Sequence, residues 1–373
     1  MAVQVGRRGT YESTVGVRLD VEDAIYMISP FDVPFLGTYG ADGRSVFGRD
    51  TTTSVKVEWL EDELVPGSDA LNEPGGVLAG DGTIDVDNGE FFKANDLIRV
   101  DDEFMRVISI AGDVLTVQRS WGTPAAAAHA DNATVLILGN LPQEGDDPVS
   151  GINFQRTQPF NNTQIYQDEV EVTRTEEKAA KYGVRSESSY QIGKRLKENA
   201  IKLERNLILG TREQDTTNRR RSHGGLDFFI TTGVDSSTTD ITLNDGDPLT
   251  DQLQNSFDRG GSVDLLAVGG TQKRAISTLN RDDIRFAREE NIRGAVVDFF
   301  DSDFGRIYIV LNRWIPTRFA FGLEKQYIEM VWFDPFFVEM LAKTGDRQEW
   351  ELIGEVTMKV RNEKAHFKFT ALQ

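Results

Sequence analysis

Cysteine is absent from this 373-residue sequence, and histidine occurs only as His129, His223 and His366. Without cysteine the chain has no disulfide, thiolate metal site or thiol nucleophile, and three scattered histidines leave little material for imidazole chemistry. No apolar run approaches the roughly 20 residues that a membrane helix needs, and the first residues lack the apolar stretch of a signal peptide. We therefore expect a protein without a membrane span that is not secreted by that route.

Basic residues are outnumbered, with 41 Lys and Arg against 60 Asp and Glu and a formal net charge of -19. This balance argues against a protein that coats nucleic acid with its whole surface. The acidity is local, because Glu61 to Asp147 holds 18 acidic and 4 basic residues. Hydrophobic residues make up 39% of the chain, and its length favours two or three domains, so we expect a sizeable core and a distinct acidic section.

The acidic section has the pattern of an inserted β-domain. Glycine and proline mark its edges, at Pro66-Gly67 and between Pro142 and Pro148, and they let a chain leave and re-enter a host element. Between the edges, short apolar runs are separated by turn residues. The strand candidates are Leu97–Val100, Glu103–Ile108, Val114–Val117 and Val135–Leu138. We predict a small barrel or sandwich over residues 66–147.

A half-buried strand is predicted on each side of the insert, around Thr53–Leu60 and Gln164–Thr173, because apolar and polar residues alternate there. Thr173 and Glu176 then have the spacing of a capping box. The short helix that they open should end at Gly183.

The longest helix is predicted for residues 186–209, where apolar residues recur at steps of three and four and Gly210 supplies a stop. One side of this helix should be buried. Its other faces should be solvated or paired with a neighbour, and they carry Lys194, Lys197 and Glu198.

Downstream, helices and strands alternate. A helix is predicted from Pro248, a strand over 263–268 and a hairpin around 301–305. Alternating residues over 356–360, a turn, and a return through 367–369 predict a C-terminal hairpin. The fold class is α+β.

Catalytic and nucleotide-binding motifs are missing from the sequence. No P-loop, dinucleotide fingerprint, zinc-binding His-Glu-x-x-His or nucleophile elbow occurs, so we expect neither an enzyme nor a cofactor. Four carboxylates in the insert could supply oxygen ligands to calcium, but their spacing does not fit an EF-hand. A plain turn is the favoured interpretation and a non-EF calcium site the alternative for Asp81, Asp85, Asp87 and Glu90.

The sharpest basic cluster is Arg219-Arg220-Arg221, in a loop after the long helix. It is either a solvated charge run or a clamp on acidic groups of another subunit or on phosphates, for which guanidinium geometry is suited. The chain's many carboxylates offer partners for such a clamp.

Five segments occur in an order that is familiar from one family. They are Trp59–Leu64 after a strand, Thr175–Gly210 with the long helix, Asn218–Ile230, Asp303–Ile307 and Leu341–Asp346. Together they span the chain outside the insert. In this order of parts the chain resembles the major capsid (major head) protein of tailed bacteriophages, which has the Hong Kong 97-type (HK-97-type) fold.

The resemblance implies an α+β HK-97-type capsid fold with an inserted small all-β domain. The N-terminal arm would be residues 1–47, and the limbs of the extended loop would be residues 48–172, which carry the insert at 66–147. The peripheral domain would be residues 173–244, with spine helix 186–209, and the axial domain residues 245–320. Residues 321–373 would return to the peripheral domain with a C-terminal hairpin.

The resemblance also implies a function. One chain would assemble into hexamers and pentamers of an icosahedral head that encloses double-stranded DNA without sequence-specific binding, helped by a separate scaffolding protein and a portal. The virion would be its location and the host cytoplasm its place of assembly. The arm and loop would bury apolar residues such as Phe31 and Trp59 mainly between subunits. The basic form of this fold lacks the acidic insert, which we expect on the outer face, away from DNA.

Other functions remain open on the sequence alone. An encapsulin-like compartment shell would share the fold. A carbohydrate-binding or adhesion protein would use the β-insert as its working module, and a secreted hydrolase would need a cleft with a pKa-shifted carboxylate.

Overall fold

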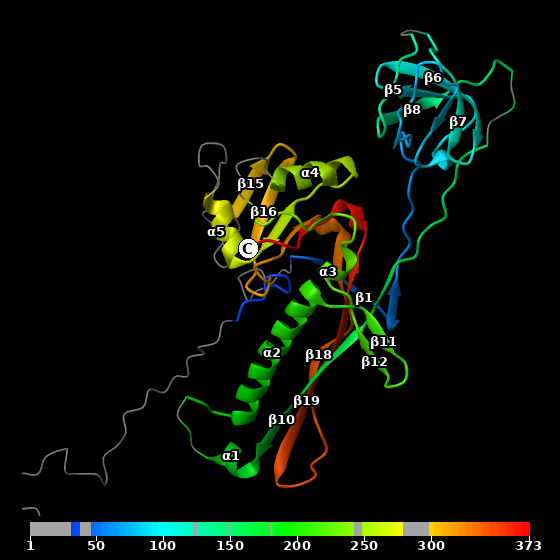
Figure 1. Cartoon of the computed structure of the whole chain (residues 1–373). Coiled ribbons are helices and arrows are strands. Elements are labelled where there is room, and N and C mark those ends of the chain that lie inside the picture. The colour runs from blue at the N-terminus through cyan, green and yellow to red at the C-terminus, as the bar shows by residue number, and fades with distance from the viewer. Residues whose placement is uncertain are drawn as a thin grey trace, which may run out of the picture. The chain divides into compact units, whose positions relative to one another are not determined.

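A computed structural model of the chain describes residues 31–37, 46–122, 125–145, 147, 150–179, 181, 183–241, 248–278 and 298–373. The chain divides into two compact units, shown in Figure 1. Unit 1 combines Met1–Trp59 with Pro159–Gln373, and unit 2 is Leu60–Gln158. Most of the predicted N-terminal arm and part of the predicted axial domain lie outside the described residues.

The first sheet of unit 1 is packed against the long helix, α2 (Glu187–Leu209). The order of its strands is β1-β18-β19-β10. They are β1 (Gly48–Thr51), β18 (Ile328–Met340), β19 (Arg347–Val360) and β10 (Gln164–Thr173). β18 and β19 form a long antiparallel hairpin, and β10 continues the sheet antiparallel to β19. Figure 1 shows α2 running beside β10 and β19.

The ends of α2 follow from local chemistry. The Ser186 hydroxyl accepts a hydrogen bond from the Ser189 amide at 3.3 Å, and the Gly210 amide donates to the Asn206 carbonyl at 2.8 Å. The predicted helix at 186–209 is therefore confirmed within one residue. The helix opened by Thr173, α1 (Arg174–Lys178), is shorter than expected and ends before Gly183.

The second sheet of unit 1 has six strands in the order β13-β20-β17-β14-β16-β15. They are β13 (Val234–Asp235), β20 (Phe367–Phe369), β17 (Ala320–Leu323), β14 (Leu265–Val268), β16 (Gly305–Leu311) and β15 (Asp298–Ser302). β14 is parallel to β16 and antiparallel to β17. Unit 1 also contains three further helices, α3 (Leu226–Phe229), α4 (Pro248–Asp258) and α5 (Gly270–Thr278), among its described residues. A short hairpin is formed by β11 (Glu213–Asp215) and β12 (Arg220–Ser222).

The predicted C-terminal hairpin is wrong. β20 pairs with β17 and β13 in the second sheet, whereas β19 pairs with β18 and β10 in the first. Asn362 adopts a left-handed conformation (φ 45°) and turns the chain into a short 3-10 helix, Glu363–Ala365, which redirects it. Phe367 and Phe369 are fully buried, which a two-stranded hairpin does not achieve. The long hairpin of the region is β18–β19, and it closes through residues 341–346.

The expectation that Gln164–Thr173 is a limb of the extended loop is also wrong. This segment is β10, and its buried residues Tyr166, Val170 and Val172 belong to the first sheet. The strand that pairs with β2 (Lys56–Glu58) is β9 (Phe160–Asn162), in antiparallel register. The two limbs therefore meet at residues 56–58 and 160–162.

Unit 2 is a six-stranded antiparallel sheet in the order β3-β8-β5-β6-β7-β4, with its own core. The strands are β3 (Ser68–Ala70), β8 (Thr134–Asn140), β5 (Asp96–Val100), β6 (Glu103–Ala111), β7 (Val114–Gln118) and β4 (Thr83–Asp85). Completely buried side chains include Ile98, Met105, Leu115 and Val135. Its limits at 60 and 158 are wider than the 66–147 of the sequence prediction.

Candidate functional site

Residues 31–37 are held on α2 by a buried carboxylate. Glu204 is fully buried and accepts hydrogen bonds from the Phe35 amide at 2.9 Å, the Leu36 amide at 3.2 Å and the Asn312 side-chain amide at 2.6 Å. Burial outweighs these donors and raises the pKa of Glu204 to about 7. The segment just before β1 is thus anchored to its own chain.

Two aromatic contacts extend this anchor. The Trp314 indole N–H donates to the Asp32 carbonyl at 2.6 Å, and the Arg205 guanidinium lies 4.2 Å from the Trp314 ring centroid. The Lys197 ammonium lies 5.7 Å from the ring centroid of Phe31, which is half-buried. Phe31 and Lys197, both expected at a subunit interface, therefore already make contacts within one chain.

The other interface candidates differ in their surroundings. Trp59 is only 7% exposed and packs against Phe229, with ring centroids 5.8 Å apart. The expectation that Trp59 is buried mainly between subunits is therefore wrong. Glu198 pairs with Arg195 at 2.6 Å, and Lys194 is exposed on α2.

The three arginines of the basic cluster have different roles. Arg219, with a left-handed backbone (φ 56°), and Arg220 lie at the tip of the β11–β12 hairpin, and Arg221 follows within β12, paired with Gln214. Arg221 binds the Glu355 carboxylate and donates to the Thr163 carbonyl at 2.9 Å. Arg221 is therefore bound within its own chain, at Glu355 and Thr163. Arg219 and Arg220 are exposed.

A buried polar network lies beneath this hairpin. The Tyr166 hydroxyl accepts from the Asn206 amide at 2.8 Å and lies 3.0 Å from Nε2 of His223, which is completely buried. Burial lowers the pKa of His223 to about 4 and raises that of Tyr166. These groups stay neutral at pH 7, and their hydrogen bonds give them a structural role.

The calcium candidates are not gathered into a site. Among the described residues, the carboxylates close enough together to share a metal ion are those of Glu169, Glu171 and Glu349. The four calcium candidates, Asp81, Asp85, Asp87 and Glu90, are not among them. Asp81 instead accepts a hydrogen bond from the Leu78 amide at 2.7 Å, as a turn residue does. The favoured sequence interpretation, a plain turn, agrees with this bond.

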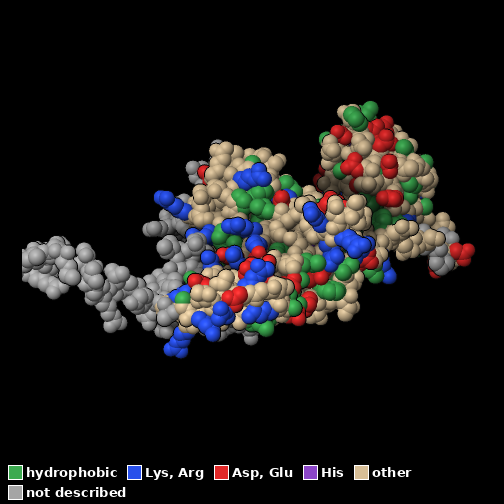
Figure 2. All heavy atoms as spheres, turned by 90° about the horizontal axis from the view of Figure 1, so that it is seen from below, with side chains coloured by type: hydrophobic (Ala, Val, Ile, Leu, Met, Phe, Trp, Pro, Cys, Tyr) green, Lys and Arg blue, Asp and Glu red, His purple; other side chains and the backbone are tan. Residues whose placement is uncertain are grey.

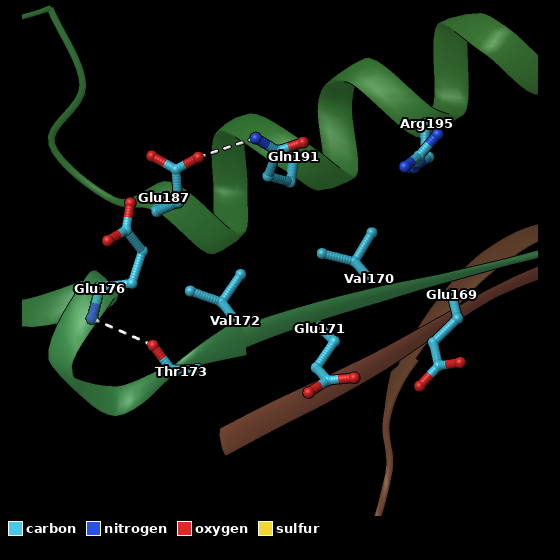
Figure 3. A pocket seen from close by; sticks show the side chains of 9 residues that line it. All are labelled: Glu169, Val170, Glu171, Val172, Thr173, Glu176, Glu187, Gln191 and Arg195. Atoms are coloured by element: carbon cyan, nitrogen blue, oxygen red, sulfur yellow. Dashed lines mark hydrogen bonds between the residues drawn. The ribbon is translucent and has the colours of Figure 1, made fainter. Parts of the chain in front are cut away.

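A shallow pocket of about 300 Å³ lies between the start of α2 and β10 (Figure 3). Val170 and Val172 point from β10 toward α2, whereas Glu169 and Glu171 point to the other side of the strand. One oxygen from each of Glu169, Glu171 and Glu349 lies within 4.8 Å of the others. The sequence signal for this acidic sheet face is the occurrence of glutamates at alternate positions, Glu169 with Glu171 and Glu349 with Glu351. The motifs considered in the sequence did not include this signal.

Large apolar side chains are exposed along the second half of β18 and into the turn after it. Those more than a third exposed are Phe333, Phe337, Val338, Met340 and Leu341. Beyond Thr51, where the pairing with β1 ends, β19 is the one strand among the described residues that pairs with this half of β18. This half of β18 is therefore an edge strand with an apolar surface, a combination that usually marks an interaction site.

Charge is distributed differently over the two units. On the face in Figure 2, Lys and Arg are interspersed with Asp and Glu over unit 1, whereas the charged side chains seen on unit 2 are mostly Asp and Glu.

Among the residues that the structure describes, no helix is both long and apolar enough to cross a membrane.

Comparison with known proteins decides the family. A family model described as SU10 major capsid protein matches residues 8–373. The chain belongs to the SU10 major capsid protein family. The major capsid protein of Escherichia phage Phieco32 is 24% identical over 297 residues, which cover 65% of this chain and 82% of that protein.

Solved structures show that the fold is the HK-97-type fold of phage capsids. The capsid of Myoviridae phage XM1 matches with a TM-score of 0.51 and 11% identity over 96% of this chain and 100% of that one. A chain of Microbacterium phage Oxtober96 matches with a TM-score of 0.51 and 11% identity, over 98% of this chain and 99% of that one. The capsid of an empty GTA particle matches with a TM-score of 0.51 and 8% identity, over 97% of this chain and 99% of that one. This member of the family is thus a structural capsid protein of the virion shell, and the compartment-shell and adhesion alternatives are not favoured.

Proposed function

We propose that this capsid chain forms hexamers and pentamers that close into an icosahedral head around double-stranded DNA. It does so in the host cytoplasm with a separate scaffolding protein and a portal, and without catalysis of its own. The observation that carries the proposal is the apolar edge of β18, which the described residues of one chain leave open. The chain encloses DNA without sequence-specific contacts, in keeping with its net charge of -19.

The β18 edge supports self-assembly on two grounds. Val338 and Met340 are 39% and 57% exposed, and covering them removes apolar surface from water. The backbone of an edge strand also offers unpaired N–H and C=O groups, which natural proteins normally cover or protect. Neighbouring subunits of a shell supply such a cover.

Substitutions at this edge test the proposal. Val338→Ser with Met340→Ser should lower the melting temperature of the subunit only modestly, because both side chains are partly exposed in the single chain. Shell yield in electron micrographs should fall sharply. Leu78→Ser is the matched control, because Leu78 is 64% exposed but lies in unit 2. Equal shell yields from the edge variant and the control, with scaffold supplied, contradict the role of this edge.

Unit 2 belongs, in this proposal, on the outer face of the shell. The segment from Glu61 to Asp147 carries 18 acidic and 4 basic residues, and packaged DNA repels such a charge. Replacing residues 66–147 by a Gly/Ser linker should still permit assembly, with a less stable shell if the unit also contacts neighbours. A protease or antibody that cannot reach unit 2 on intact particles contradicts the outer placement.

A further inference from the structure

The face of the first sheet that points away from α2 carries a set of directly facing glutamates. Glu169 of β10 is paired in register with Glu351 of β19, which is paired with Glu339 of β18. Glu171 is paired with Glu349 in the same way. We call these five residues the glutamate face. Val170 and Val172, which alternate with its β10 members, point to α2 instead (Figure 3).

Among the residues that the structure describes, Arg347 is the one cation in an ion pair with the glutamate face. Arg347 lies 3.3 Å from Glu171 and also binds Glu349. Glu169 and Glu339 are exposed, and Glu351 accepts from the neutral Gln167 amide. Like charges directly opposite each other destabilise a sheet. A positively charged partner therefore gains more by binding here than at an isolated carboxylate.

Exposed apolar side chains accompany the glutamates. Phe337 is paired with Ile353 and is 41% exposed, and Ile165, four residues before Glu169 on the same face, is 48% exposed. A surface of this kind, apolar and charged together, suits a protein partner better than a free ion.

The same chain presents a matching basic surface at the end of the β11–β12 hairpin. Arg219 and Arg220 are exposed there, and neither is in an ion pair with any residue that the structure describes. Their neighbour Arg221 binds Glu355, which is paired with Ile165 at one end of the same sheet face. The base of the hairpin is thus fixed beside the sheet, while its tip projects away from β10 and β19 (Figure 1).

We propose that the glutamate face binds the Arg219–Arg220 tip of a second copy of the chain. This inference rests on the proposed assembly and names one contact within it. Guanidinium groups bind carboxylates through two parallel hydrogen bonds, so the chemistry of the two surfaces is complementary. Because the two surfaces differ, the contact is head-to-tail, and its repetition by rotation closes a ring such as a capsomer.

Charge reversal and its compensation test the contact. In Arg219→Glu with Arg220→Glu, shell yield should fall by about tenfold or more, because like charges then face each other. Adding Glu169→Arg and Glu339→Arg should restore shells. Arg313→Glu with Lys325→Glu is the control, since it makes the same change of charge at exposed positions elsewhere in unit 1 and should leave the yield unchanged. If the reversed hairpin does not fold, Arg219→Gln with Arg220→Gln replaces it.

Cross-linking supplies a second measurement, because the chain contains no cysteine. Thr216→Cys at the hairpin tip, combined with Glu339→Cys, should give covalent oligomers after oxidation of assembled particles, seen on non-reducing gels. The contact is overturned if the wild type and the variant Arg219→Glu with Arg220→Glu form shells equally well, or if no covalent oligomers appear. Either result leaves the proposed function intact. The contact is also overturned if the control forms shells but the compensated variant, with Glu169→Arg and Glu339→Arg added, does not. That result assigns the glutamate face to another partner. A wild-type chain that never assembles refutes the proposed function itself.

Discussion

Replacing Glu103 by glutamine should weaken unit 2 more than any other single charge-neutralising change there. Glu103 is 1% exposed and accepts two hydrogen bonds from Arg119 at 2.8 Å each, one from the Ser120 amide at 3.1 Å and one from the Ala127 amide at 2.9 Å. His129 lies 3.1 Å away. Burial favours the neutral acid, but these donors together outweigh it and hold the pKa of Glu103 at about 2.

The magnitude follows from that pKa. A fall from 4.5 to about 2 corresponds to about 3 kcal/mol of stability. Glutamine also leaves the Arg119 guanidinium, which is 10% exposed, without its counter-charge. We expect Glu103→Gln to lower the free energy of unfolding of unit 2 by about 3 kcal/mol at pH 7.

Urea unfolding of the fragment 60–158 measures this loss, with Trp121 as its single tryptophan reporter. Glu90→Gln, at an exposed position of unit 2, is the control and should change little. Since the pKa of Glu103 is lowered on folding, its contribution is present above pH 4.5 and disappears as the pH falls through 2. The gap between wild type and variant should therefore close over that range. A gap below 0.5 kcal/mol at pH 7, or one that does not depend on pH, refutes the reasoning.

Three further predictions concern unit 1. Folding raises the pKa of Glu204 to about 7, so its stabilising contribution is lost as the pH rises from 4.5 through 7; the stability of Glu204→Gln relative to the wild type should increase by about 3 kcal/mol over that range in urea titrations. Folding lowers the pKa of His223 and His366 to about 4, so stability should fall as the pH drops from 6.5 toward 4, and His223→Gln should show a smaller fall in melting temperature. In Gly225→Ala the new Cβ would meet the Asn206 carbonyl oxygen at 2.5 Å and other backbone atoms below 3 Å, so calorimetry should show a loss of about 2 kcal/mol; an unchanged melting temperature would show that the chain relaxes there without cost.

Local chemistry explains which parts of the fold were predictable. α2 was placed within one residue because Ser186, the apolar stripe and Gly210 are all local signals. The partners of β10 and β20 were not predictable, because strand pairing joins segments that lie far apart in the sequence. Alternation shows that Val170 and Val172 share a face, but not which strand lies beside them.

The candidate interaction surfaces show the same limit. The arginine cluster was visible in the sequence, yet the contact of Arg221 with Glu355 joins residues 134 positions apart. The glutamate face needed the register of three strands before its members could be seen to lie opposite one another. Sequence alone gave the alternation of Glu169 and Glu171, which is also common on solvated strands.

Cryo-electron microscopy of particles from cells that express this chain together with its scaffolding protein tests the central claim most directly. We predict closed shells whose fivefold and sixfold rings are built from this one chain, with the apolar edge of β18 covered by neighbouring subunits. Compact monomers under every assembly condition, or shells in which this edge stays open to solvent, contradict the account.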